Sequence, residues 1–258
     1  MALNYATYGE PSAQALLLIH ALGADLRFWE ECGAILGSRY FCIAPDLRPA
    51  GSSPKSAVPV EIGQHLLDLD ELRINLGIRG VVPVGCAMGG LVGAHCAARY
   101  PRSVRALVMA NPGLRNTDAA KAMLRGRVEE IRKRGIGFLL PGAVDRAFHN
   151  LPQDSRYERY LSRFAAQDAD AYVQSVLGFL DIDISGIAPT IACPTLLVPG
   201  EHDVLMAKED GPRLRQILPR AELRPMRDTA HFVPFQAPDR FAAMVVEFLE
   251  ALPARPPG

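Results

Sequence analysis

The sequence has no excess of either charge, no apolar run long enough to cross a bilayer, and few cysteines. Lysine plus arginine and aspartate plus glutamate number 28 each, so no overall field would attract nucleic acid or an anionic membrane surface. The uninterrupted apolar runs, such as ALLLI at residues 15–19, are much shorter than the roughly 20 residues of a membrane-spanning helix. We therefore expect neither nucleic acid nor a membrane among its partners.

The five cysteines are odd in number and scattered, and no two of them form a C-x-x-C pair. This pattern argues against a disulfide scaffold and against a cysteine-based zinc site. The first residues, MALNYATYGEP, have neither the basic segment nor the apolar segment of a secretory signal. These features predict reduced thiols and a cytoplasmic location.

Short apolar runs alternate with amphipathic stretches along most of the chain. In VEIGQHLLDLDELRINLG, residues 60–77, apolar side chains recur every three or four residues, which is typical of a helix. Helices are also predicted at 88–99 and 239–252. Strands are predicted at 15–20, 40–45, 81–85, 104–110, 195–199 and 221–226. Such alternation predicts an α/β fold with a mostly parallel sheet covered by helices on both faces.

The alternation is interrupted once, between residues 114 and 186, where the pattern is helical and no strand is predicted. It resumes at Pro194. We interpret residues 114–186 as a helical cap inserted over the sheet, and residues 1–113 and 187–258 as the α/β core.

A possible catalytic turn lies in VVPVGCAMGG, residues 81–90, between a predicted strand and a predicted helix. A strand followed by G-x-nucleophile-x-G holds its central residue on a sharp, strained turn whose neighbours must be small. Gly85, Gly89 and Gly90 meet that need. The central residue is Ala87, however, which carries no nucleophile, and the glycines alone are equally compatible with a simple close-packing turn.

Two residues follow in the order in which this architecture places an acid and a histidine after the nucleophile. Asp203 stands in PGEHD, just beyond the strand predicted at 195–199, where sites of α/β folds lie. His231 stands in DTAHFVPFQAPDRF, before the last predicted helix. A histidine bonded only to the backbone of a surface loop is the alternative for His231, but the order of the three positions favours a catalytic pair.

Five stretches together resemble the α/β-hydrolase fold family over nearly the whole chain: HALGADLRFW, APDLRPAGSS, VGCAMGGLVGAHCAARYP, VPGEHD and TAHFVPFQAPDRF. The pattern over residues 20–29 and the short helical cap are most similar to the 3-oxoadipate enol-lactonase group. The resemblance implies that Asp203 is the acid and His231 the base. It also implies that the backbone N–H groups of Leu22 and Met88 form the oxyanion hole.

The chain departs from this family at two positions. The family often has glycine in the place of Ala21, and it has serine in the place of Ala87. Loss of the serine hydroxyl alone would leave the other site residues in register, so we interpret the chain as an inactive variant in which alanine was substituted for the nucleophile. A natural ligand-binding relative with a native alanine is the alternative. Cys86 is not expected to replace the serine, because only the central residue of the turn points into the pocket.

The predicted cap begins with KAMLRGRVEEIRKRG, which is rich in arginine. These arginines could belong to a solvated helix face held by i,i+4 ion pairs. Alternatively, Arg125 or Arg127 points into the pocket and binds a substrate carboxylate. Trp29 and Phe232 are further candidates for substrate binding, with packing of a helix against the sheet as the alternative for Trp29.

With serine at position 87, these residues predict a hydrolase of a small carboxylic ester or lactone that works through an acyl-enzyme and needs no metal or organic cofactor. Two alternatives remain open. Amide and carbon–carbon bond hydrolases use the same triad, and a non-catalytic homologue would use the pocket to bind a ligand. Nothing in the sequence indicates an oligomeric state.

Overall fold

The computed structural model describes residues 2–253, which form a seven-stranded sheet with the strand order β1-β3-β2-β4-β5-β6-β7. Strand β1 runs antiparallel to β3, and every other neighbouring pair is parallel. The strands are β1 (Tyr5–Tyr8), β2 (Ala15–Ile19), β3 (Phe41–Pro45), β4 (Val81–Cys86), β5 (Leu107–Ala110), β6 (Thr195–Val198) and β7 (Ala221–Leu223). The predicted mostly parallel sheet is therefore confirmed.

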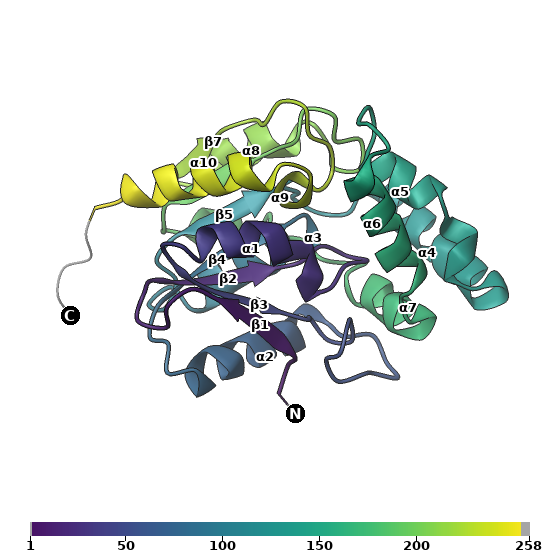
Figure 1. The fold of residues 1–258 in the computed structure, drawn as a ribbon, viewed down its shortest axis with the longest axis horizontal. Coiled ribbons are helices and arrows are strands. Elements are labelled where there is room, and N and C mark those ends of the chain that lie inside the picture. Colours follow the sequence, from purple (N-terminus) through teal and green to yellow (C-terminus); the bar gives the residue numbers. More distant parts are fainter. Residues whose placement is uncertain (1, 254–258) are drawn as a thin grey trace.

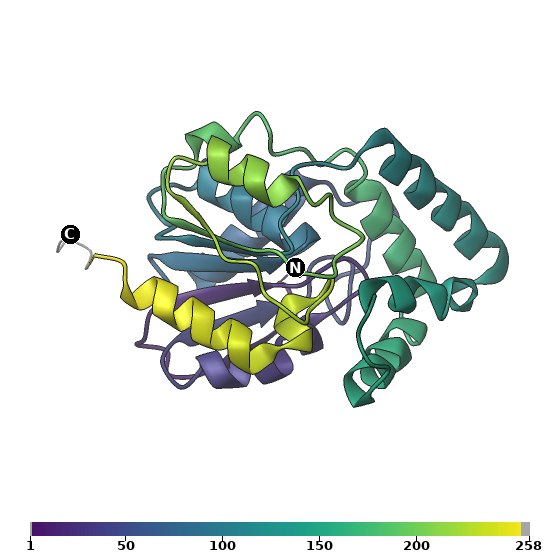
Figure 2. The same cartoon turned by 90° about the horizontal axis from the view of Figure 1, so that it is seen from above.

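Helices cover both faces of this sheet (Figures 1 and 2). One face carries α1 (Glu30–Leu36) and α10 (Pro238–Glu250). The opposite face carries α2 (Ile62–Asn75), α3 (Met88–Arg99) and α8 (Asp210–Ile217). The remaining short helices of this part are η1 (Leu26–Trp29), η3 (Ala188–Thr190) and α9 (Val233–Gln236).

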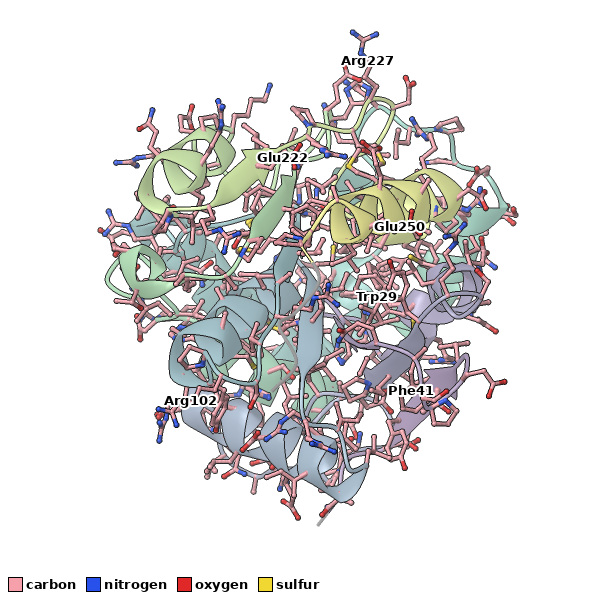
Figure 3. The ribbon with its side chains drawn as sticks, turned by 90° about the vertical axis from the view of Figure 1, so that its left-hand side faces the viewer. Trp29, Phe41, Arg102, Glu222, Arg227 and Glu250 are labelled. Carbon is pink, nitrogen blue, oxygen red and sulfur yellow. The ribbon has the colours of Figure 1, made fainter. Side chains whose placement is uncertain are left out.

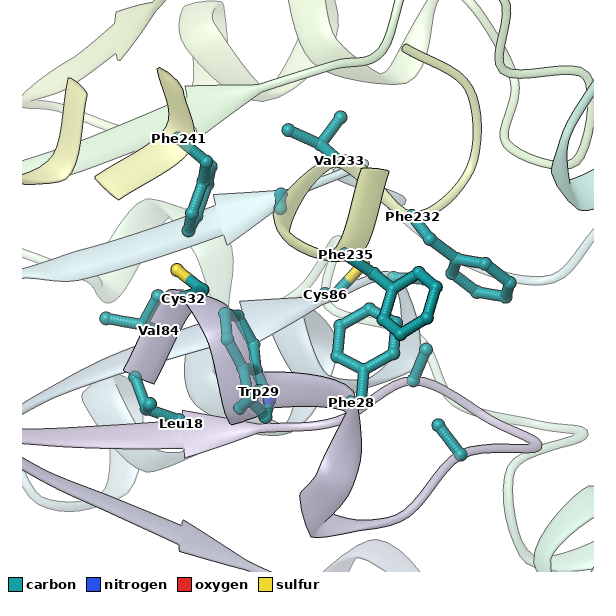
Figure 4. Packing of buried hydrophobic residues seen from close by; sticks show 14 of the residues in the cluster. Leu18, Phe28, Trp29, Cys32, Val84, Cys86, Phe232, Val233, Phe235 and Phe241 are labelled. Carbon is teal, nitrogen blue, oxygen red and sulfur yellow. The ribbon is translucent and has the colours of Figure 1, made fainter. Parts of the chain in front are cut away.

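The alternation of side chains along the buried strands divides the interior into two hydrophobic cores. Leu16 and Leu18 of β2 pack into the core beneath α1 and α10, whereas Leu17 and Ile19 pack into the core on the α3 side. Figure 4 shows part of the first core, where aromatic rings from η1 and α9 meet. All five residues of β2 are buried, as expected for a strand covered on both faces.

Four α-helices and the 3-10 turn η2 occupy residues 118–178, between β5 and β6. They lie beyond the ends at which the parallel strands finish, on the right in Figures 1 and 2. Side chains cap the helices: Thr117 accepts a hydrogen bond from the N–H of Ala120 (3.1 Å), and Asp154 and Asp168 cap the next two long helices in the same way. These elements are α4 (Asp118–Arg134), η2 (Ile136–Leu139), α5 (Gly142–Ala147), α6 (Ser155–Ala165) and α7 (Ala169–Gly178).

Six of the seven strands lie where the sequence predicts them, and β1 was not predicted. Its four residues are half-exposed on the sheet edge, so they lack the apolar run of the inner strands. Strand β7 ends at Leu223, three residues before its predicted end. Among residues 2–253, no helix combines the length and the apolar character needed to cross a bilayer.

Candidate active site

The sharp turn between β4 and α3 consists of the single residue Ala87, whose backbone angles are φ 49° and ψ −114°. The Ala87 N–H donates to the Ala110 carbonyl (2.9 Å), and the Ala87 carbonyl accepts from the Gly90 N–H (2.9 Å). A positive φ at a residue with a side chain costs on the order of 1–3 kcal/mol and persists only where the surroundings enforce it. The turn thus keeps a strained geometry although its side chain is only a methyl group.

Two glycines are needed for this turn because backbone lies where their side chains would stand. A Cβ on Gly85 would overlap the backbone of Gly89 and Gly90. A Cβ on Gly89 would overlap the Ile19 carbonyl and lie 2.7 Å from the His20 carbonyl oxygen. The glycines therefore let α3 begin directly against the end of β2.

The expected contact between Asp203 and His231 is present. His231 Nδ1 lies 3.0 Å from Asp203 Oδ1 and 3.1 Å from Oδ2, and both side chains are buried. Because a carboxylate oxygen only accepts hydrogen bonds, Nδ1 of the neutral imidazole carries the proton and donates it to Asp203. The Nε2 lone pair is then available as a base, and His231 lines the same cavity as Ala87.

Asp203 accepts three hydrogen bonds besides that of His231. The backbone N–H groups of Leu205 (2.9 Å) and Met206 (3.2 Å) donate to Oδ1, and the Asn111 amide donates to Oδ2 (2.9 Å). Burial raises the pKa of Asp203, but the charge of His231 and these hydrogen bonds outweigh burial and hold the pKa below its ordinary value. The carboxylate is therefore stabilised as the anion that an imidazolium partner needs.

Asn111, which the sequence analysis did not identify, connects the loops of Asp203 and His231. It stands after β5, fully buried, with a positive φ of 50°. Its amide also donates to the Ala230 carbonyl (2.7 Å), and its side-chain oxygen accepts from the Val233 N–H (3.1 Å). The available signal was an asparagine directly after an apolar strand, at the carboxyl edge of the sheet where α/β sites lie.

Leu22 and Met88, the two predicted oxyanion donors, both line the cavity that contains Ala87. Met88 is the first residue of α3, so its N–H has no acceptor within the helix. The turn of Leu22 is fixed by buried His20. The Leu47 N–H donates to His20 Nε2 (2.9 Å), so the proton is on Nδ1, which donates to the Ala21 carbonyl (2.9 Å). Burial lowers the pKa of His20 and keeps it neutral in this role.

The cavity above Ala87 has a volume of about 140 Å³ and is lined mainly by apolar and aromatic side chains. Phe232 lies in its wall as the sequence predicts, and its ring packs 4.6 Å from that of Tyr160. The Tyr160 hydroxyl is occupied, because it donates to the Gly23 carbonyl (2.9 Å). The helices of residues 118–178 contribute several of the lining residues, so this segment forms one wall of the site.

A second, more polar cavity of about 460 Å³ adjoins the first. The two share Leu22, Met88, Tyr172 and Phe179 in their walls. His20 and Gln167 are among the polar residues of the second cavity. Leu22 and Met88, the predicted oxyanion donors, therefore stand on the border between an apolar and a polar cavity.

Arg127 lies in the wall of the apolar cavity, next to buried Tyr172. Burial raises the pKa of the Tyr172 phenol, and the charges of Arg127 and Arg146 act against that increase. Burial and the charge of Arg127 lower the pKa of Arg146, so the two guanidinium groups repel each other. Among residues 2–253, neither arginine has a carboxylate partner at ion-pair distance.

Two predicted substrate contacts are not supported. Trp29 is completely buried and lies outside the cavity wall, with its ring edge-on to Phe28 (centroids 5.4 Å apart), because η1 turns it into the core (Figure 4). Seen from the end opposite α4 to α7, Arg102 and Arg227 project outward from the molecule, unlike Trp29 (Figure 3). Arg125 is exposed and absent from the cavity wall, since it points from a different side of α4 than Arg127.

Cys86 cannot take the place of the missing nucleophile. Cys86 is completely buried, its Sγ lies 3.6 Å from the Asn111 side-chain oxygen, and burial raises the pKa of the thiol, so it is not a thiolate nucleophile.

Among the described residues, one group of possible metal ligands gathers at the surface, namely Glu201, His202 and Asp228. None of the three lines the cavity of Ala87.

Known hydrolases resemble the chain over most of its length. It is 26% identical to 3-oxoadipate enol-lactonase 2 of Acinetobacter baylyi over 244 residues, which covers 93% of this chain and 90% of that protein. It is 27% identical to the putative carbamate hydrolase RutD of Escherichia coli over 249 residues, with 93% and 92% coverage.

Solved structures show the same fold. The enol-lactonase from Burkholderia xenovorans superposes with a TM-score of 0.89 at 25% identity, covering 96% of both chains. A thermophilic esterase from Thermogutta terrifontis superposes with a TM-score of 0.88 at 24% identity, covering 96% of this chain and 93% of the esterase. A family model described as the alpha/beta hydrolase fold matches residues 14–238. The predicted fold is thereby confirmed, and the chain belongs to the α/β-hydrolase family.

Proposed function

We propose that the apolar cavity is the active site of a hydrolase of small carboxylic esters or lactones, and that Ala87 occupies the place of a catalytic serine. The observation that carries the proposal is the Asp203–His231 hydrogen bond, which lies beside a strained turn in the wall of one cavity. A hydrolase would need this arrangement, whereas close packing of a strand and a helix would not. The enol-lactonase relatives support lactones or esters, and the carbamate hydrolase relatives keep an amide-type bond as the alternative.

The mechanism follows from the positions of these groups once a hydroxyl stands at position 87. His231 Nε2 takes the hydroxyl proton while the oxygen attacks the substrate carbonyl, and Asp203 stabilises the imidazolium that forms. The N–H groups of Leu22 and Met88 hold the tetrahedral oxyanion. His231 protonates the leaving oxygen, and water then releases the acyl group by the same sequence of proton transfers.

Arg127 in the cavity wall, with Arg146 near it, favours a substrate that bears a carboxylate. Arg127 and Arg146 have no acidic partner among residues 2–253, and a bound anion would relieve their mutual repulsion. We propose that the segment 114–186 acts as a cap and that Arg127 is its contact to this carboxylate. Arg125 of the same helix provides a matched control because it is exposed.

The test of this subsite compares Arg127→Gln with Arg125→Gln. Hydrogen bonds to charged groups contribute about 1.5–3 kcal/mol, which corresponds to roughly a 10–100-fold loss of affinity for a carboxylate-bearing lactone in Arg127→Gln. Arg125→Gln should bind normally. If titration calorimetry gives Arg127→Gln and Arg125→Gln equal affinities for this lactone, the proposal that the substrate bears a carboxylate is wrong.

The main test is Ala87→Ser. Loss of the nucleophile in triads of this type costs as much as about 10⁶ in turnover, so the serine variant should hydrolyse its substrate several orders of magnitude faster than the alanine form. Affinity should change little, since the new hydroxyl adds one atom facing His231. The assay compares both forms on enol-lactones, aryl esters and amides. His231→Gln in the serine background should abolish the gain.

The outcome also separates the hydrolase from a binding protein. If the serine variant cleaves no compound of the panel while the alanine form binds one tightly, the pocket serves as a receptor and the hydrolase proposal is wrong. If the serine variant cleaves only amides, the proposed substrate becomes an amide instead of an ester or lactone.

A further inference from the structure

The cavity keeps a base and oxyanion donors but offers no group that could attack a carbonyl. Among residues 2–253, those that line it include no serine, threonine, cysteine, lysine or carboxylate. Cys86 is buried behind the turn, and the hydroxyl of Tyr160 is bound to the Gly23 carbonyl. Burial raises the pKa of the Tyr172 phenol, so that it stays protonated and is a poor nucleophile. Covalent catalysis therefore has no nucleophile, whereas proton transfer to His231 Nε2 needs none.

Proton abstraction next to a carbonyl requires only the groups that are present. A base must reach the C–H bond, and hydrogen-bond donors must stabilise the oxyanion of the enolate, in a site that excludes water. The Nδ1–H bond to Asp203 (3.0 Å) orients the His231 ring and places the lone pair on Nε2. Leu22 and Met88 line the same apolar cavity as His231 and Ala87, and the Ala87 side chain is smaller than that of serine by one oxygen atom.

We propose that the chain as it stands, with alanine at position 87, catalyses proton transfer at the carbon between two carbonyl groups of a small 1,3-dicarbonyl compound. His231 Nε2 takes the proton, the C–H electron pair forms the C=C bond of the enolate, and the negative charge moves to the carbonyl oxygen at Leu22 and Met88. The imidazolium exchanges its Nε2 proton with solvent water and then protonates the carbon, which gives the hydrogen-exchanged compound, or the enolate oxygen, which gives the enol tautomer. Solvent water is the only further reactant.

The 1,3-dicarbonyl class follows from the strength of the base. An imidazole is too weak to deprotonate a simple ketone quickly, but a second carbonyl makes the C–H bond acidic enough for it. The apolar wall formed by side chains such as Phe232 and Val176 accepts the alkyl groups of such a compound. This activity shares the cavity with the proposed hydrolase but requires no ester bond, so each can fail while the other holds.

The test follows loss of the central C–H signal of 3-methylpentane-2,4-dione in D₂O by proton NMR, with the unmodified chain. Exchange should be about 10²-fold or more faster than with His231→Gln. Arg125→Gln, an exposed residue outside the cavity, should match the unmodified chain. Exchange no faster than with His231→Gln, at probe concentrations up to the solubility limit, overturns the proposal.

A second variant covers the possibility that His231→Gln fails to fold. Ala87→Ser places a hydroxyl between the base and the carbon and should reduce exchange at least tenfold while the fold, followed by circular dichroism, is kept. Exchange that is unchanged in Ala87→Ser would place the reaction outside this cavity and refute the inference. Acetate among the products would instead indicate carbon–carbon cleavage, which also contradicts it.

Discussion

Glycine-to-alanine changes should have opposite effects on stability in the turn at Ala87 and in helix α4. At Gly89 the new Cβ would overlap the Ile19 carbonyl and lie 2.7 Å from the His20 carbonyl oxygen, whereas ordinary contacts begin at 3.4 Å. Since both neighbours are backbone, α3 must move away from β2. Overpacking of this kind costs about 1–3 kcal/mol or more.

Gly126 provides the matched control. It lies in the interior of α4, and nothing stands within 4 Å of the Cβ that alanine would add. Alanine is favoured over glycine in a helix interior by about 1 kcal/mol, so Gly126→Ala should stabilise the protein. Gly90→Ala is a second control inside the turn, because its Cβ would meet its nearest atoms at 3.5 Å and should be accommodated.

Thermal unfolding followed by circular dichroism measures these differences. In a chain of this size 1 kcal/mol shifts Tm by roughly 2–4 °C, so Gly89→Ala should lower Tm by about 2–12 °C and Gly126→Ala should raise it by about 2–4 °C. In the Ala87→Ser background, Gly89→Ala should also reduce kcat more than it changes KM, because Met88 moves with the helix. A Gly89→Ala protein as stable as the unmodified chain would refute the close approach of α3 to β2.

Three further substitutions test the support of the site. Folding lowers the pKa of Asp203, so the ionised carboxylate contributes fully to stability above the ordinary value of 3.8. This contribution is lost as pH falls through the folded-state pKa. The Tm difference between the unmodified chain and Asp203→Asn should therefore shrink at acidic pH. Asn111→Ala in the Ala87→Ser background should lower kcat by 10-fold or more, with a shifted pH profile, since Asp203 and the His231 loop lose their common partner; an unchanged profile would make Asn111 purely structural. Phe28→Ala should cost about 3–5 kcal/mol in urea unfolding, because its ring is buried and stacks on Phe235 (centroids 5.6 Å apart).

The inner strands could be predicted because burial on both faces gives them continuous apolar runs. The edge strand β1 could not, since it alternates between exposed and half-exposed residues and is only four residues long. Helix α1, with two glutamates and a cysteine at its start, owes its position to packing against α10. A helix of seven residues is too short for the spacing of its apolar side chains to indicate such a long-range contact.

The sequence could predict those parts of the candidate site that depend on the order of residues along the chain. Ala87, Asp203 and His231 stand in the turn or loops that follow β4, β6 and β7, which the parallel topology ends at one edge of the sheet, so their meeting follows from the fold. Which face of a cap helix looks inward does not follow, and the sequence therefore could not separate Arg127 from Arg125. Asn111 was missed because its partners are backbone groups of distant loops.

The geometry of the turn at Ala87 depends on backbone hydrogen bonds and neighbouring glycines rather than on the side chain at position 87. Its N–H bonds to the Ala110 carbonyl, its carbonyl bonds to the Gly90 N–H, and the space around it is set by Gly85 and Gly89. The positive φ therefore survives with a methyl group, and the fold specifies where a reacting atom stands but not what it is. If both proposals hold, one oxygen at position 87 decides between proton transfer and acyl transfer. Ala87→Ser should accordingly raise ester or lactone hydrolysis and lower carbon-bound hydrogen exchange in the same protein, and a variant in which both activities rise would show that the two reactions do not share His231.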